Sequence, residues 1–169
     1  MKARQRGFSL LELVVSILVI SVLMAIAYQR LERMVEDVER VTFEGTVKNI
    51  QAQLTLQVAN WYAEQIEVEK DQFSEINPLE LVQHKPSNYM GEVHFSQLSD
   101  HPAERWYYVK DKHWLVYKAK RYSQLVNEFE QPDLLIYRLV TKFEHPGRNR
   151  GLALEATLRP IHRFKWQAD

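Results

Sequence analysis

The stretch FSLLELVVSILVISVLMAIAY, residues 8–28, decides the architecture of this chain. Its only charged residue is Glu12, and its small polar residues are Ser9, Ser16 and Ser21. A helix over these residues is about 31 Å long, enough to cross the hydrocarbon core of a membrane. The sequence therefore predicts a membrane-spanning helix over residues 8–28.

The preceding residues 1–7, MKARQRG, form a short basic leader with the charges of Lys2, Arg4 and Arg6 and no acid. Positive charge on a short N-terminal flank favours its retention in the cytoplasm. We therefore expect the N-terminus to be cytoplasmic and the bulk of the chain to lie on the opposite side of the membrane.

The composition excludes several classes of protein. The 169 residues include 22 basic and 22 acidic side chains, so no global positive field favours nucleic acid. The absence of cysteine excludes a disulfide framework, thiolate zinc sites and a cysteine nucleophile. The length allows one ordinary domain beyond the apolar segment.

An ordinary signal peptide is one interpretation of the N-terminus. Ala25-Ile26-Ala27 could supply the small-residue cut, which would release a periplasmic binding module that begins at Tyr28. The apolar core is long for a signal peptide, and Glu12 lies near its start. Both features count against this alternative.

The string RGFSLLELVV, residues 6–15, supports a second interpretation. It resembles the N-terminal motif of type IV prepilins and of the pseudopilins of type II secretion. The resemblance implies that a prepilin peptidase cuts after Gly7 and that Phe8 becomes the N-methylated terminus. It also implies that Glu12 guides subunit assembly.

The resemblance further implies the partners and the location of the chain. The partners would be other pilin or pseudopilin subunits through the N-terminal helix, the peptidase/methyltransferase, the inner-membrane assembly platform and membrane lipid. The chain would cross the inner membrane once, with its C-terminal domain in the periplasm, before it enters a pilus or pseudopilus.

The chemistry of these residues suits that processing and assembly. Gly7 has no side chain to obstruct a peptidase. A carboxylate at the centre of a membrane helix costs about 2.5–3.5 kcal/mol, and less near the interface. Glu12 could simply reach the headgroups from its shallow position. Alternatively, it could pair with the Phe8 amine of a neighbouring subunit, which would offset the cost of burial and fix the axial register.

Helical periodicity continues over residues 29–66. Leu31, Met34, Val38 and Val41 follow a spacing of three and four residues, and a second apolar series from Val47 to Tyr62 is slightly out of phase. We predict one helix from Phe8 to about Ile66, roughly 88 Å long. A membrane-proximal coiled coil for generic dimerisation is the alternative interpretation of this stretch.

After a connecting segment over residues 67–88, a period of two predicts an antiparallel sheet domain over residues 89–160. The expected strands lie around 93–95 and at 106–110, 113–118, 134–143 and 152–159, with Asp111-Lys112 as a two-residue hairpin turn. The predicted fold is α+β: a long N-terminal helix with the sheet packed on its second half, as in pilins. Residues 106–109, 115–118 and 135–140 are also similar to the sheet of minor pilins of mannose-sensitive haemagglutinin pilus systems.

Two departures from the family favour a minor pilin or pseudopilin over a major shaft subunit. Many major pilins have a C-terminal cysteine pair and a helix-kinking proline near the apolar stretch, and this chain has neither.

The sequence lacks the common phosphate-loop, nucleophile-elbow and zinc-protease motifs, and its six histidines show no ligand spacing. We therefore expect no enzyme activity, no catalytic residue, no metal site and no cofactor.

The C-terminal run RPIHRFKW, residues 159–166, mixes basic and aromatic residues and leads into a tail at residues 161–169. Such a mixture can bind single-stranded nucleic acid through stacking and phosphate contacts. The alternative is that Phe164 and Trp166 dock on the sheet or on a neighbouring subunit. We favour the second interpretation and do not expect a nucleic-acid partner.

Overall fold

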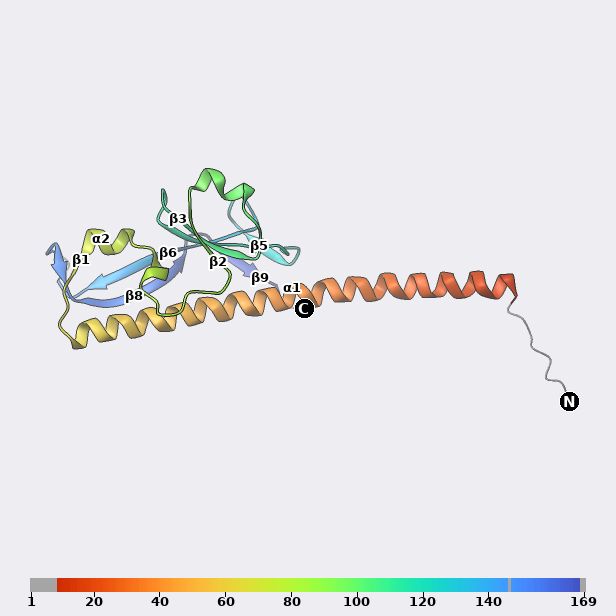
Figure 1. Cartoon of the computed structure of the whole chain (residues 1–169), viewed down its shortest axis with the longest axis horizontal. Helices are drawn as coiled ribbons and strands as arrows, with labels where there is room; N and C mark the ends of the chain where they lie inside the picture. Colours follow the sequence, from red (N-terminus) through yellow and green to blue (C-terminus); the bar gives the residue numbers. More distant parts are fainter. Residues whose placement is uncertain (1–8, 146, 168–169) are drawn as a thin grey trace. The chain divides into compact units, whose positions relative to one another are not determined.

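The computed structural model describes residues 9–145 and 147–167 of the chain (Figure 1). The chain divides into two units, Met1–Val38 and Glu39–Asp169, which we call the N-terminal unit and the head. Helix α1, Leu10–Ala63, contributes to both. The remaining elements belong to the head: β1 Val68–Glu69, α2 Lys70–Glu75, η1 Pro78–Glu80, β2 Tyr89–Val93, η2 Phe95–Asp100, β3 Arg105–Val109, β4 Trp114–Lys118, β5 Leu125–Asn127, β6 Leu134–Phe143, β7 Arg150–Gly151, β8 Ala153–Pro160 and β9 Phe164–Trp166.

Helix α1 ends three residues before the predicted Ile66 because the chain turns into a left-handed conformation at Gln65, where φ is 56°. The Ile66 N–H donates to the carbonyl of Trp61 (2.8 Å), and the Gln65 N–H donates to that of Tyr62 (3.2 Å). These two bonds form a Schellman motif, which satisfies carbonyls of the last turn. Gln65 occupies the position that usually holds glycine, so no ordinary stop signal is present in the sequence there.

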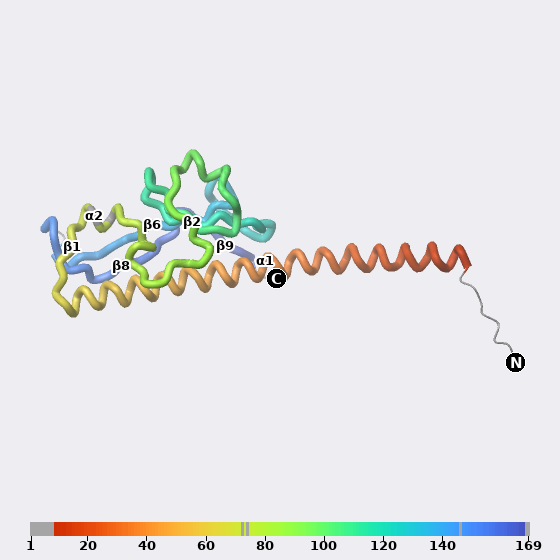
Figure 2. The backbone as a smooth tube through the Cα atoms, viewed as in Figure 1, coloured from red at the N-terminus to blue at the C-terminus, as the bar shows by residue number. Residues whose placement is uncertain are grey.

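The main sheet has five strands in the order β2-β3-β4-β6-β8. Three of its four pairings are antiparallel, as predicted, whereas β2 and β3 are parallel. The expectation of antiparallel pairing is therefore wrong for β2. Between the two strands, η2 and the segment that follows it return the chain to the end of the sheet at which β2 began. Figure 2 shows this crossover.

Two local predictions in this region are also wrong. Phe95 begins η2 rather than continuing a strand, because its N–H is taken by the Asp111 carboxylate (2.9 Å). The connection between β3 and β4 has four residues instead of two, since Val109 pairs with Trp114. His113, the last residue of that loop, has a positive φ of 54°.

The core of the head lies between α1 and one face of the sheet. Phe43, Ile50, Leu54 and Val58 of α1 are buried against a cluster that the sheet residues Trp106, Leu115, Tyr117, Leu135, Tyr137 and Leu158 help to form. The opposite face of the sheet carries a second cluster around Tyr107, Val116 and Ile136, which Leu98 of η2 joins. The predicted α+β class is confirmed: a long, apolar N-terminal helix precedes a mixed, mainly antiparallel sheet in a pilin-like arrangement.

Two glutamines of α1 bind neighbouring backbone segments and fix them to the helix. The Gln51 carboxamide donates to the Ala156 carbonyl (2.9 Å) and accepts from the Leu158 N–H (2.8 Å), so it occupies the free edge of β8. The Gln53 carboxamide makes the same pair of bonds to the carbonyl and N–H of His84 (3.2 and 2.9 Å). Each glutamine thereby hydrogen-bonds to one carbonyl and one N–H group that do not bond to a neighbouring strand.

Candidate functional site

The first turn of α1 contains the one candidate residue from the sequence whose position the structure describes, Glu12. Ser9 precedes the helix and caps it, because its hydroxyl accepts the Glu12 N–H (3.1 Å) while its carbonyl accepts the Leu13 N–H (3.1 Å). The Glu12 carboxylate is the acidic group of this turn, where it also complements the positive end of the helix dipole. Ser9 and Glu12 occupy the S-x-x-E positions of a capping box.

The surroundings of Glu12 are apolar and uncovered. Leu10, Leu11 and Leu13 are 81%, 74% and 51% exposed, and the large apolar side chains from Val14 to Ile26 are all at least half exposed. Within the described residues, one helix is long and apolar enough to cross a membrane, and none of its apolar window is buried. Apolar surface of this extent requires a lipid or protein environment.

The hydroxyls within this segment are satisfied by the helix itself. Ser16 Oγ donates to the carbonyl of Glu12 and Ser21 Oγ donates to that of Ile17, both at 2.7 Å. Such bonds to the preceding turn remove the cost of bringing a hydroxyl into an apolar medium. Glu12 is thus the single charged group that an apolar environment around residues 10–28 has to accommodate.

The other candidate residues, Gly7 and Phe8 at the expected cut and Lys2, Arg4 and Arg6 in the leader, lie outside the described residues. Their assignments remain predictions.

Sequence reasoning missed a buried carboxylate in the head. Glu39 is only 6% exposed and accepts the Tyr117 hydroxyl (3.1 Å) together with the N–H groups of Lys120 (2.9 Å) and Arg121 (3.1 Å). The Arg121 guanidinium lies 3.9 Å from Glu39 and 2.7 Å from Glu104. Burial and the nearby Glu39 carboxylate raise the pKa of Tyr117. Glu39 therefore attaches the segment after β4 to α1. The sequence signal for its burial is its position four residues before the buried Phe43, which places both residues on the same face of the helix.

The C-terminal run docks onto the core. Residues 164–166 form strand β9, which pairs with β5, and the rings of Phe164 and Trp166 lie 6.1 and 5.8 Å from that of Phe43. Trp166 is 8% exposed. The docking interpretation is confirmed for these two side chains, of which Trp166 is buried and Phe164 is half-buried.

The histidines and carboxylates form no metal-binding group among the described residues. His94 lies 3.6 Å from Asp111, and His113 lies 3.1 Å from the carbonyl of Glu75, so each is engaged in local structure. Burial raises the pKa of the neighbouring Tyr108, whose hydroxyl donates to the same Glu75 carbonyl (2.6 Å), to about 12. The bonds of Tyr108 and His113 to the Glu75 carbonyl connect the end of α2 to β3 and the β3–β4 loop.

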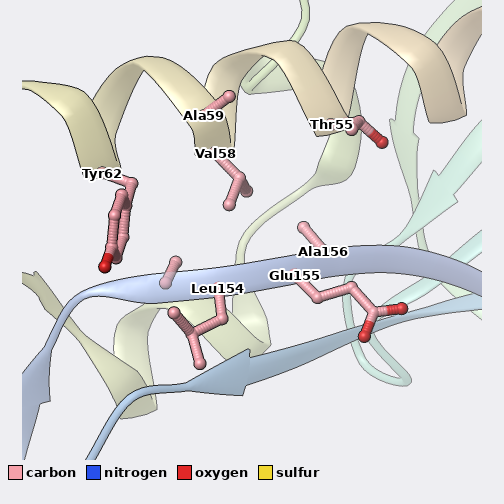
Figure 3. A pocket seen from close by; sticks show the side chains of 8 residues that line it. Thr55, Val58, Ala59, Tyr62, Leu154, Glu155 and Ala156 are labelled. Atoms are coloured by element: carbon pink, nitrogen blue, oxygen red, sulfur yellow. The ribbon is translucent and has the colours of Figure 1, made fainter.

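A predominantly apolar pocket of about 390 Å³ lies between α1 and β8 (Figure 3). Val58, Ala59 and Tyr62 line it from the helix, and Ala153, Leu154 and Ala156 line it from the strand. Glu155 is the carboxylate in the lining, and it bonds to Lys142 and to the Thr157 hydroxyl. The pocket therefore presents no constellation for acid–base or nucleophilic chemistry.

Comparison with known proteins identifies the N-terminal segment. A family model described as the prokaryotic N-terminal methylation motif matches residues 2–28, about a sixth of the chain. The chain thus carries the signal of type IV prepilins and pseudopilins, which supports a subunit of the type IV pilin or pseudopilin type and points to a structural role rather than an enzymatic one. No curated protein and no solved structure matches the chain at a significant level.

Proposed function

We propose that this chain is a minor pilin or pseudopilin that is cut after Gly7, methylated at Phe8 and built into a type IV pilus or a related secretion filament. The observation that carries the proposal is the combination of the methylation motif at residues 2–28 with a helix whose apolar N-terminal side chains are exposed. Such a helix can be anchored in lipid first and then packed among other subunits. The absence of cysteine and of a helix-kinking proline favours a minor subunit over a shaft subunit.

Processing changes the electrostatics of the N-terminus. The leader places Lys2, Arg4 and Arg6 at the cytoplasmic face, and these charges favour the orientation in which the head lies in the periplasm. Removal of residues 1–7 eliminates all three charges and leaves one amine at Phe8. The prepilin peptidase/methyltransferase and the inner-membrane assembly platform are the partners that this sequence of events requires.

In this proposal, Glu12 sets the axial register between neighbouring subunits of the filament. Its carboxylate is the only charged group in residues 8–28, and it lies about 6 Å along the axis from Phe8. When the apolar helix enters a filament, pairing with the Phe8 amine of the adjacent subunit offsets the cost of burying both charges. Neutralising Glu12 should therefore impair assembly and leave the fold of the head unchanged.

Mass spectrometry of the mature N-terminus tests the proposal. The full chain is expressed together with a prepilin peptidase, purified from membranes and digested. We expect an N-terminal peptide that begins at Phe8 and is one methyl group heavier than the unmodified sequence. A Gly7→Leu variant is the control, and it should retain the leader because its side chain obstructs the scissile bond.

A mature terminus at Tyr28 would contradict the proposal and support ordinary signal-peptidase release of a periplasmic binding module. An uncut chain in the presence of active peptidase would also contradict it. The motif match does not favour either of these alternatives.

A further inference from the structure

The outer edge of strand β8 has no partner strand in the main sheet, because β8 lies at the end of the strand order. Strand β1 covers the start of this edge. The Leu152 carbonyl accepts the Glu144 N–H on the β6 side, so the neighbouring Gly151, which pairs with β1, faces the outer side. The outer edge is therefore covered up to residue 151.

The Gln51 carboxamide covers the edge again further along β8, where it bonds to the Ala156 carbonyl (2.9 Å) and the Leu158 N–H (2.8 Å). Within the described part of the chain, no backbone hydrogen bond joins residues 153–155 to any segment other than β6. The outer edge of residues 153–156 therefore lacks a partner except at the Ala156 carbonyl. We call residues 153–156 the open edge.

A β-bulge lies within the open edge. The pairing of β6 with β8 shifts between Lys142 and Phe143, so that Leu154 stands opposite no residue of β6. A bulge residue is left out of the ladder. The N–H of Ala156 points to the outer edge, because its carbonyl does so and the two groups of one residue point the same way in an antiparallel pair. The open edge thus offers backbone groups with which another extended segment can pair.

The apolar pocket of about 390 Å³ lies beside the open edge, whose residues all line it (Figure 3). Val58, Ala59 and Tyr62 of α1 form the facing wall, and the Tyr62 ring points from the helix towards β8. Tyr62 and Leu154 are 44% and 50% exposed, so apolar surface remains uncovered on both walls. Side chains of a strand alternate between its two faces. A strand on the open edge would therefore direct every second side chain towards α1 and the pocket.

We infer that the open edge and the pocket bind an extended peptide segment of a partner protein, by strand addition to β8. The backbone of the segment pairs with the open edge, and one apolar side chain fills the pocket. In this mode of recognition the main-chain hydrogen bonds supply affinity and the pocket supplies specificity. The segment continues along β8 the pairing that β1 already makes with β7 on the same edge.

Other occupants fit less well. A hydrocarbon chain would remove water from the backbone groups of the open edge without replacing their hydrogen bonds. Every strand of the described residues already belongs to a sheet, and the open edge is short and bounded at both ends, so the sheet edge of a second copy has little room to pair there. The inference goes beyond the proposed function and concerns the head alone. It can fail while processing at Gly7 and Phe8 remains intact.

Peptide binding to the full-length chain in lipid nanodiscs tests the inference, because no free detergent is then present to fill the pocket. The probes are four fluorescein-labelled peptides of the sequence Ser-Val-Thr-X-Thr-Val-Ser, in which X is valine, leucine, phenylalanine or tyrosine. We expect at least one of them to bind with a Kd below about 1 mM in fluorescence anisotropy. Bound peptide should slow hydrogen exchange of the Ala156 amide at least about tenfold, whereas Leu158, whose N–H is already bonded to Gln51, should keep its rate.

Backbone methylation of the peptide that binds most tightly distinguishes strand pairing from simple apolar binding. One version carries N-methyl groups on the residues whose N–H points to one edge of the peptide, and a second version carries them on the alternate residues. Both versions keep the side chains. We expect one version to bind at least about tenfold more weakly than the parent and the other to bind within about threefold of it, because only one edge of the peptide faces β8.

An Ala59→Leu variant fills the pocket from α1 and should weaken binding of the parent peptide at least about tenfold. Ala52→Leu is the matched control, because Ala52 is likewise an exposed alanine of α1 and is not part of the pocket lining. It should leave the affinity within about twofold of the wild type. Tryptophan emission establishes that both variants are folded.

Three results would each overturn the inference: a Kd above about 1 mM for all of the peptides, equal affinities of the two methylated versions, or wild-type affinity of the Ala59→Leu variant. Equal affinities of the methylated versions together with weaker binding to Ala59→Leu would assign the pocket to an apolar ligand that makes no strand pairing.

Discussion

Leu23 and Leu54 belong to the same helix, yet they are 60% and 1% exposed. In the N-terminal unit the apolar side chains of α1 have no covering layer, whereas in the head the sheet covers them. Burial of a leucine side chain contributes about 1.5–3 kcal/mol. The head therefore obtains this contribution within one chain, and we expect the N-terminal unit to obtain it from lipid or from other subunits. Hydrophobic residues of one helix thus serve folding in one region and association in the other.

Among the substitutions considered, Phe43→Ala should cause the largest loss in the free energy of unfolding of the head. Phe43 is 3% exposed, and its ring lies 5.1–6.2 Å from five aromatic rings of the sheet and β9. We expect a loss of about 3–5 kcal/mol in the free energy of unfolding of the head. Denaturant unfolding followed by tryptophan emission measures this, because all four tryptophans lie in the head.

The matched control for Phe43→Ala is Leu23→Ala in the N-terminal unit, which should change the unfolding of the head by less than about 0.5 kcal/mol. Equal effects of the two substitutions would show that the helix stabilises both regions in the same way and would remove the basis of the comparison.

Glu39→Ala tests whether the buried Glu39 carboxylate contributes to the free energy of unfolding of the head. The substitution leaves the Tyr117 hydroxyl and the N–H groups of Lys120 and Arg121 without their acceptor, at a cost of about 2–4 kcal/mol. Glu44→Ala, which removes an exposed ion pair with Arg40 at 4.0 Å, should cost less than about 0.5 kcal/mol. Indistinguishable midpoints for the two variants would refute the role of Glu39.

Gln51→Ala should have a smaller effect, about 1–2 kcal/mol, because it frees the Ala156 carbonyl and the Leu158 N–H at the edge of β8. Hydrogen exchange should show faster exchange at Leu158, while the amides on the β6 side of the strand keep most of their protection. Unchanged exchange at Leu158 would mean that the carboxamide is dispensable for that edge.

The stability of the head should also depend on alkaline pH. The pKa of Tyr108 is about 12 in the folded state, against about 10 in an unfolded chain. Its contribution to stability is complete below about pH 10 and is lost as pH rises towards 12. Tyr108→Phe should therefore reduce the decline in stability between pH 10 and 12, whereas Tyr122→Phe, at an exposed position, should not. Parallel curves for the three proteins would contradict this assignment.

The sequence predicted the parts of the fold that have a long, regular pattern. The apolar run over residues 8–28 and the alternation at 134–143 and 152–159 predicted the N-terminal part of α1 and the strands β6 and β8. The phase change between the two apolar series of the helix also has a structural counterpart. Leu31, Met34, Val38 and Val41 are more than half exposed, whereas Ile50, Leu54 and Val58 form part of the core.

The elements that sequence analysis missed depend on long-range partners. Strands β1 and β7 contain two residues each and exist because Val68 and Glu69 pair with Gly151 and Arg150. Periodicity cannot show in two residues. The basic and aromatic residues of strand β9 predict a surface tail. Its docking depends on the position of Phe43, which the sequence does not show. Of the candidate site, the structure describes Glu12 and its serine cap, whereas the cut and the leader remain predictions.

Incorporation of a Glu12→Gln variant into filaments is the most direct test of the central claim that the N-terminal helix assembles through its single carboxylate. The variant keeps the size of the side chain and removes its charge. The account predicts at least a tenfold loss of the subunit from purified filaments, with normal membrane levels and a normal unfolding midpoint of the head, while Glu32→Gln, at an exposed position of the same helix, assembles normally. Incorporation of Glu12→Gln at the wild-type level would contradict the account and leave the helix as a membrane anchor alone.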